Sequence, residues 1–165
     1  QLVLATKLNI CDGVSLRLAN VYGPSSANSS ANDRGILNKI IGLALAGDIV
    51  SLYGGGEYIR DYIYIDDVVD AFILASISSK SAGEVFNVGS GVGTSVRDAF
   101  NAVTQEVYRQ TNKIIEMKDM PWPENSPKID MRNFTASIKK AHTCLGWSPK
   151  VSLQTGIATT VKSII

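Results

Sequence analysis

Cysteine and histidine are scarce in this sequence, which limits the chemistry that it can carry. Its 165 residues include 2 cysteines, Cys11 and Cys144, and 1 histidine, His142. The cysteines lie far apart without CxxC spacing, so we predict reduced, structural thiols, as in a cytosolic protein, and neither a disulfide nor a metal site. His142 has Lys139 and Lys140 nearby and no acid or nucleophile beside it in sequence, which indicates a surface side chain rather than a catalytic one.

The sequence also lacks a long apolar run and a cluster of basic residues. The 16 lysines and arginines nearly balance the 15 acidic residues, so the formal net charge is +1. We therefore expect no nucleic-acid partner, no membrane span and no secretory signal, and we predict a cytoplasmic location. A hydrophobic content of 45% over 165 residues is enough for one core, and residues 1–165 are predicted to form a single unit.

The most informative stretch is RDYIYIDD, which begins at Arg60. The β-branched and aromatic residues Tyr62 to Ile65 predict a buried strand, and the apolar spacing after them predicts a helix whose free amides Asp66 would cap. Arg60 and Asp61 would stand at the entrance of this strand. Two readings of Arg60 are open at this point: it binds an anion in a cleft, or it is a surface arginine paired with Asp61 or Glu57.

Hydrophobic spacing and turn residues predict helices and strands along the rest of the chain. Helices are predicted over residues 1–8, 36–46, 66–78 and 137–145 and after Ser95 and Ser152, and strands over residues 14–19, 49–53, 84–88 and 113–118. We expect the strand at 49–53 to pair with the strand at 62–65 across the glycines between them. Residues 25–34 should form a mobile loop, and residues 119–127, which include 3 prolines, should be extended.

The glycine-rich segment from Gly89 to Gly93 follows a predicted strand, which invites a phosphate-loop reading. It matches neither the dinucleotide fingerprint nor the P-loop, because no Lys-Ser/Thr pair follows it. We therefore interpret it as a strand-to-helix connection, in which Ser95 caps the next helix and Asp98 completes a capping box.

Several blocks of sequence together carry a resemblance to a known family. In chain order they are Leu16–Pro24, Leu52–Gly56, Arg60–Asp67, Phe86–Gly89 and Leu145–Pro149. Their content, order and spacing closely resemble the NAD-dependent epimerase/dehydratase family, the extended short-chain dehydrogenases that act on nucleotide-activated sugars and include UDP-glucose 4-epimerases and dTDP-glucose 4,6-dehydratases. The resemblance implies an α/β fold, namely the C-terminal part of a Rossmann-like fold with a few parallel strands and a small substrate-binding α/β subdomain.

Only the C-terminal half of the family pattern is present. Family members carry a Gly-x-x-Gly-x-x-Gly turn for NAD and a Tyr-x-x-x-Lys catalytic pair, and this sequence has neither. The resemblance therefore implies the nucleotide-sugar-binding half of an NAD-dependent epimerase or dehydratase whose parent is a homodimer. This half alone would hold no catalytic residue, would be inactive and would not bind NAD. The alternative is a non-catalytic binding or interaction domain that kept the fold, and the sequence upstream of Gln1 would distinguish the two.

The resemblance also assigns residues to the diphosphate of a nucleotide sugar. Asn20 matches the family asparagine that donates hydrogen bonds to the diphosphate, and Arg60 matches the arginine that pairs with it, which favours the anion-binding reading of Arg60. A guanidinium suits this role because it keeps its charge and offers parallel donors. Asp130 matches an acid that helps to hold ribose and phosphate, although Pro127 stands where many members have an arginine.

Other positions match the parts of the family that meet the nucleobase, the substrate and the cofactor. Ser51 and Tyr53 match the short strand that brackets the nucleobase, with Tyr53 available for stacking. Gly35 and Ile36 match a helix start close to the substrate, where an exposed amide could serve an anion. The backbone from Leu18 to Val21 matches the segment that approaches the nicotinamide, so Leu18 and Val21 are the predicted cofactor contacts.

Overall fold

The computed structural model describes residues 1–24 and 35–165, and the loop predicted at 25–34 lies outside the described residues. The fold is α/β. The helices are α1 (Leu2–Lys7), α2 (Gly35–Ala46), α3 (Ile65–Ile77), α4 (Val96–Thr111), α5 (Lys139–Leu145) and α6 (Leu153–Lys162), with short 3-10 turns η1 (Gly54–Gly56) and η2 (Lys128–Met131). The strands are β1 (Ser15–Leu18), β2 (Asn20–Tyr22), β3 (Val50–Tyr53), β4 (Ile59–Tyr64), β5 (Val85–Val88), β6 (Gly93–Ser95) and β7 (Met117–Met120).

The described strands form small, mostly parallel sheets. β1 pairs with β5, β2 pairs with β4, and β3 pairs with β7, all parallel, while β6 adds antiparallel to β4. The predicted strand at 14–19 is present as β1, and the chain continues almost directly into β2. The amide of Ala19 donates to Val88 O at 2.8 Å, whereas Asn20 is in register with Tyr62, so the same stretch passes from one sheet to the next.

The predicted pairing of residues 49–53 with 62–65 is wrong. Gly54, Gly55 and Gly56 all have positive φ (57°, 71° and 68°) and form η1 instead of a tight hairpin turn. This turn carries the chain away from β3, so β3 pairs with β7, and β4 lies between β2 and β6. A run of glycines predicts a turn, but it does not determine with which strand the preceding strand pairs.

Helix ends agree with the sequence in most places. Ser95 accepts a hydrogen bond from the Asp98 amide at 3.0 Å and Ser152 accepts one from the Thr155 amide at 3.1 Å, so both predicted caps are confirmed. The predicted cap at Asp66 is wrong, because α3 already begins at Ile65 and no side chain caps it. β4 also begins earlier than predicted, at Ile59, so Arg60 and Asp61 lie within the strand.

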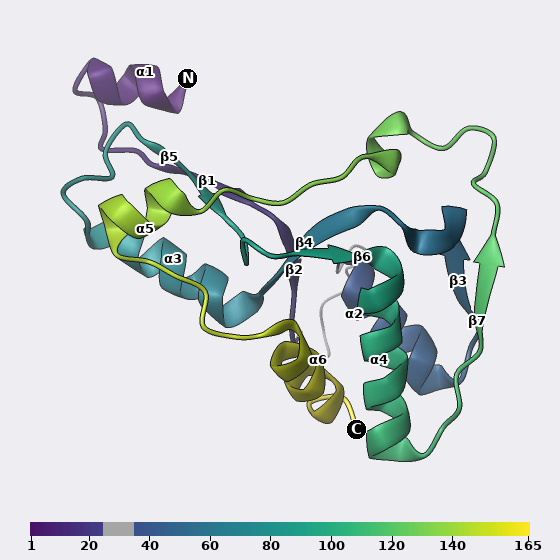
Figure 1. Ribbon diagram of the computed structural model, residues 1–165. Helices are drawn as coiled ribbons and strands as arrows, with labels where there is room; N and C mark the ends of the chain where they lie inside the picture. The colour runs from purple at the N-terminus through teal and green to yellow at the C-terminus, as the bar shows by residue number, and fades with distance from the viewer. Residues whose placement is uncertain (25–34) are drawn as a thin grey trace.

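The helices pack in groups on either side of β4 (Figure 1). One hydrophobic cluster joins α2, α4 and α6 with β3 and β4, and the other joins β1, β5, α3 and α5 around Trp147. Tyr62 and Tyr64 belong to the first cluster and Ile63 to the second, because successive side chains of a strand point to opposite faces. Arg60 therefore shares the face of Tyr62, and Asp61 shares the face of Ile63.

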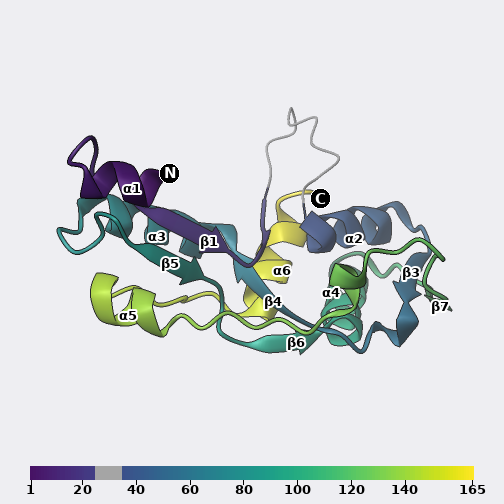
Figure 2. The same ribbon diagram turned by 90° about the horizontal axis from the view of Figure 1, so that it is seen from above.

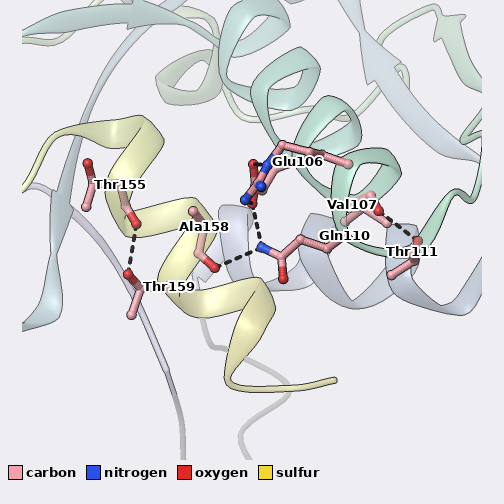
Figure 3. Close-up of polar contacts among 8 residues, drawn as sticks. Glu106, Val107, Gln110, Thr111, Thr155, Ala158 and Thr159 are labelled. Atoms are coloured by element: carbon pink, nitrogen blue, oxygen red, sulfur yellow. Dashed lines mark hydrogen bonds and ion pairs between the residues drawn. The ribbon is translucent and has the colours of Figure 1, made fainter.

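A hydrogen bond from α4 helps to hold α6 in place. Gln110 Nε2 donates to Ala158 O in α6 at 3.1 Å and also to Glu106 (Figure 3). The Glu106 carboxylate in addition accepts a bidentate pair from Arg109, at 2.9 and 2.6 Å. The arginine lowers the pKa of Glu106 through its hydrogen bond and its charge.

Viewed from above, the strand pair β1–β5 lies toward one end of the molecule and the pair β3–β7 toward the other, with β4 running between them (Figure 2). Cys11 and Cys144 are both free thiols, of which Cys11 is exposed and Cys144 partly buried. In the described part of the chain, every helix is too short or too polar to cross a membrane.

Candidate functional site

A cavity of about 460 Å³ lies between α2, β3, β4 and α4. Its apolar walls come from α2 and α4, including Ile40, Leu43 and Phe100. Strand β4 contributes Arg60 and Tyr62, which face the cavity together because they are two positions apart on one strand. The site is therefore built on the first of the two hydrophobic clusters and takes its position from β4.

Most of the predicted substrate-binding residues lie around this cavity. The lining includes Asn20, Ile36, Ser51, Tyr53, Arg60 and Asp130. Gly35 does not line it, but φ is +73° there and a Cβ would lie 2.7 Å from Val21 O, so glycine permits the close approach of α2 to β2. Residues from separate elements thus converge on one space, as a ligand site requires.

Arg60 is anchored by main-chain carbonyls. Its guanidinium donates to Ile59 O at 3.0 Å, to Asp130 O at 2.6 Å and to Arg132 O. No ion pair joins it to Asp61 or Glu57 within residues 1–24 and 35–165. The carbonyl contacts hold the cation at the cavity wall.

Asp61 points away from the cavity and ties several segments together. Its buried carboxylate accepts hydrogen bonds from Ser90 N at 2.7 Å, Ser90 Oγ at 2.6 Å, Gly91 N at 3.0 Å and Ala136 N at 3.0 Å. The amides of the glycine-rich segment are thus engaged by a carboxylate of the protein, which agrees with the interpretation of that segment as a connection. The bond to Ala136 also fixes the stretch that brings Asp130 and Arg132 to Arg60.

A second cavity, of about 310 Å³, adjoins the first. It lies at the end of β1 and is lined by Leu18, Ala19, Asn20, Arg60, Ile129, Asp130, Arg132 and Phe134. Asn20, Arg60 and Asp130 line both cavities and form a shared wall. The amide nitrogen of Asn20 donates to Asp61 O at 2.9 Å, which fixes its side chain at this wall.

Of the two predicted cofactor contacts, Leu18 lies at a cavity and Val21 does not. Leu18 is 42% exposed at the edge of the smaller cavity. Val21 is paired with Ile63 between β2 and β4, packs against the second hydrophobic cluster and lines neither cavity.

Sequence reasoning identified Tyr53 but missed the other aromatic residues of the larger cavity, Tyr58, Tyr62 and Trp122. The Trp122 ring stacks on Tyr53, with centroids 5.8 Å apart and planes inclined by 29°, and it meets the edge of Tyr58 at 6.1 Å. Strand alternation from Arg60 could have identified Tyr62, but nothing in the sequence around Trp122 shows where residues 121–127 fold. Lys39, which also lines the cavity, lies on the same α2 face as Ile36 and Ile40 and could have been found from helical spacing.

Two residues that line this cavity, Tyr62 and Trp122, each contain a buried polar atom without a partner in the described part of the chain. Within the described residues, Tyr62 Oη and Trp122 Nε1 make no hydrogen bond. Burial raises the pKa of Tyr62 to about 12, although the charge of Arg60 acts in the opposite direction, so the phenol is neutral near pH 7. The described residues also include no group of three His, Cys, Asp or Glu side chains placed to hold a metal ion.

A family model and individual relatives match this chain. The model described as the NAD dependent epimerase/dehydratase family matches residues 1–89. The UDP-glucose 4-epimerase of Mycolicibacterium smegmatis is 36% identical over 146 residues, which are 87% of this chain and 42% of the relative. The dTDP-D-glucose 4,6-dehydratase of Homo sapiens is 31% identical over 150 residues, which are 90% of this chain and 40% of the relative.

A solved structure shows the same fold. The crystal structure of UDP-glucose 4-epimerase from Thermotoga maritima with UDP-glucose has a TM-score of 0.74 and 37% identity, covering 90% of this chain and 44% of that one. The chain thus spans about two fifths of the length of the curated relatives it matches, 42% and 40% for the two above. The expected fold, the C-terminal part of a Rossmann-like α/β architecture, is confirmed.

Proposed function

Because the chain belongs to the NAD-dependent epimerase/dehydratase family, we propose that it binds a nucleoside-diphosphate sugar across the two adjoining cavities described above. The nucleoside fills the larger cavity, the sugar enters the smaller one, and the diphosphate lies between them. The observation that carries this proposal is the wall of Asn20, Arg60 and Asp130, which both cavities share. A ligand with a flat ring at one end, a sugar at the other and anionic groups between them fits this arrangement.

Arg60 is the residue proposed to bind the diphosphate. Its guanidinium is positioned by carbonyl oxygens rather than neutralised by a carboxylate, so its positive charge is available to an anion. A guanidinium also has more N–H donors than these carbonyls use. Asn20 would add an amide donor from the other side of the wall, and the start of α2 at Gly35 and Ile36 would add a backbone amide.

The nucleobase is proposed to lie at the aromatic end of the larger cavity. Ser51 and Tyr53, on the short strand β3, border this end. Tyr53 is 41% exposed, so part of its ring is accessible to a base. A planar base gains dispersion and stacking energy against such a ring.

NAD is proposed as the cofactor of the whole protein, which we infer to be a nucleotide-sugar epimerase or dehydratase. The exposed apolar side chain of Leu18 at the smaller cavity fits contact with a flat, uncharged ring face. Val21, which lines neither cavity, would contribute only backbone. When bound, NAD supplies a hydride acceptor, and the residues of this chain would orient the sugar beside it.

Calorimetric titration of the 165-residue chain with UDP-, dTDP-, GDP-, CDP- and ADP-sugars tests the proposal, with NAD as a comparison. We expect saturable binding of at least one nucleotide sugar and none of NAD alone. Arg60→Ala should weaken that binding by about 1.5–3 kcal/mol, which is the scale of hydrogen bonds to a charged group. Arg109→Ala, on the far part of α4, is the control and should leave the affinity unchanged.

If Arg60→Ala binds as tightly as the unmodified chain, Arg60 is not a diphosphate ligand. Absence of binding for every nucleotide sugar, with the chain shown to be folded by circular dichroism, would contradict the proposed site itself.

A further inference from the structure

Residues 121–134, which we call the strap, form one wall of both cavities. The strap leaves the end of β7 and passes back across the molecule toward α5 (Figure 1), and just beyond it the amide of Ala136 is fixed by Asp61. It contributes Trp122 and Asp130 to the larger cavity and Ile129, Asp130, Arg132 and Phe134 to the smaller one. A ligand in either cavity would therefore lie between the strap and the rest of the protein.

The strap has little structure of its own. Within residues 121–134 the only regular element is η2, and Pro121, Pro123 and Pro127 have no amide hydrogen to donate. Every residue of the strap is exposed or only partly buried. Segments with few buried apolar contacts and few backbone hydrogen bonds open locally at a low cost in free energy. The strap is therefore suited to opening while the rest of the fold stays intact.

The strap is attached to β4 and η1 near its two ends. The amide of Ile59 donates to Asn133 Oδ1 at 2.9 Å, and Ile59 O accepts from the amide of Phe134 at 3.0 Å. Toward the other end, Trp122 packs directly on the backbone of Gly54, where a Cβ would lie 2.0 Å from the indole nitrogen. These contacts hold the strap against the cavities.

Arg60 joins the strap to the proposed anion site. Its guanidinium donates to Asp130 O and Arg132 O, which both belong to the strap, and to Ile59 O in its own strand. A guanidinium has more N–H groups than these carbonyls use, and within the described residues the N–H of Nε and one of Nη2 stay available. The same side chain can thus bind an anion and keep the strap closed.

Building on the nucleotide-sugar site proposed above, we propose that the strap is a closing element that opens as a unit in the free chain and is held shut by the bound nucleotide sugar. The ligand contacts strap residues in both cavities and engages Arg60, so it binds the closed arrangement and not the open one. A ligand that binds one of two states stabilises that state by the factor 1 + [L]/Kd. Ligand binding and strap closure therefore stabilise each other through Arg60.

Limited digestion with trypsin measures the opening of the strap. Trypsin can cut after Lys128 and Arg132, which lie in the strap, and after Lys80, an exposed residue between α3 and β5 that serves as the reference site in the same digest. The probes are UDP-, dTDP-, CDP-, GDP- and ADP-glucose, whose Kd values calorimetry supplies. For a probe that binds, a concentration of about 10 times its Kd should slow cleavage at Lys128 and Arg132 about 10-fold and leave Lys80 unchanged.

Asn133→Ala separates strap closure from ligand contact. Asn133 lines neither cavity, but its side chain is one of the attachments of the strap to Ile59. Its loss should speed cleavage of the strap about 5-fold in the ligand-free chain and change the probe affinity by less than about 2-fold. Asn38→Ala is the matched control, because Asn38 exchanges hydrogen bonds with Gly23 rather than with the strap, and it should leave strap cleavage unchanged.

Arg60→Ala should change both measurements, because Arg60 holds the strap and also binds the ligand. Loss of its two bonds to strap carbonyls should speed ligand-free cleavage at Lys128 and Arg132 by about 10-fold or more, and the probe affinity should fall as well. Asn133→Ala and Arg60→Ala therefore share the effect on cleavage and differ in the effect on affinity.

Failure of this inference can be distinguished from failure of the proposed function. Saturable binding without protection at Lys128 and Arg132, or with equal slowing at Lys80, overturns the inference and leaves nucleotide-sugar binding intact. Equal ligand-free cleavage of the strap in the unmodified chain, Asn133→Ala and Arg60→Ala also overturns it, because these groups would then not hold the strap. Absence of binding for every probe overturns both.

Discussion

Substitution of Asp61 should destabilise the protein more than substitution of an exposed aspartate. Its carboxylate is fully buried and accepts hydrogen bonds from Ser90 N, Ser90 Oγ, Gly91 N and Ala136 N at distances of 2.6–3.0 Å. In Asp61→Ala the three amides lose their acceptor inside the protein. We expect the free energy of unfolding to fall by about 3–5 kcal/mol, which is less than the sum of the separate bonds because water can enter the space.

Urea unfolding followed by circular dichroism measures this loss. For an m-value of about 2 kcal/mol/M, a loss of about 4 kcal/mol lowers the midpoint by about 2 M. Asp61→Asn separates volume from hydrogen bonding, because it keeps the size of the side chain but replaces one acceptor oxygen with a donor. It should therefore also destabilise, although it leaves no cavity.

Asp70→Ala is the matched control. Asp70 makes an exposed ion pair with Lys150 at 2.7 Å, and exposed pairs contribute little to stability. If Asp61→Ala lowers the midpoint no more than Asp70→Ala does, the carboxylate is not what ties β4 to the segments at Ser90 and Ala136. The prediction about Arg60 would weaken with it, because the Ala136 contact fixes the stretch that supplies carbonyls to the guanidinium.

Two further predictions concern stability. Tyr22→Phe should lower the free energy of unfolding by about 0.5–1.5 kcal/mol, because it removes a hydrogen bond to Leu153 O. Tyr62→Phe should not lower it, because the hydroxyl of Tyr62 has no partner among the described residues. The urea midpoints of the two variants compare these effects directly. Glu106→Gln should destabilise at pH 7, because Arg109 lowers the pKa of Glu106 in the folded state and the unfolded chain regains the ordinary value of about 4.3. That stabilisation is present above the pKa of the unfolded state and is lost as the pH falls through the pKa of the folded state. The thermal midpoints of the unmodified chain and of Glu106→Gln should therefore converge in acid. A difference between the two midpoints that stays constant down to about pH 2 would contradict this prediction.

Helix caps and helix ends could be predicted from the sequence where they depend only on residues that are close together in the chain. The caps at Ser95 and Ser152 and the end of α5 at Gly146, where φ is +66°, follow from side chains and backbone freedom within a few residues. The cluster of candidate site residues was also predictable, although through resemblance rather than through spacing. Its residues come from separate elements, and no local rule brings Ser51 and Asp130 to the same cavity.

Tertiary packing decided which strand pairs with which and what the acidic residues do. β3 pairs with β7, which lies far along the chain, because the partner and register of a strand depend on how the surrounding helices are arranged. In the Asp66-Asp67 pair, the expected cap was Asp66, but Asp67 is the buried residue, and it accepts from the amides of Lys150 and Val151 at 2.9 and 3.0 Å. The donors are the amides of Lys150 and Val151, which are more than 80 residues away in sequence and come close to Asp67 only in the folded protein.

The sequence by itself determined the α/β class, most helix ends and the resemblance to a family, because these depend on periodicity, capping and motifs that are written locally. The tertiary structure decided that Arg60 is held by carbonyls, that Asp61 ties the glycine-rich segment, and that Trp122 lies on Gly54 beside Tyr53. Each of these contacts joins residues that are distant in sequence or approach through a turn, and only the packed chain brings them within hydrogen-bonding or van der Waals distance.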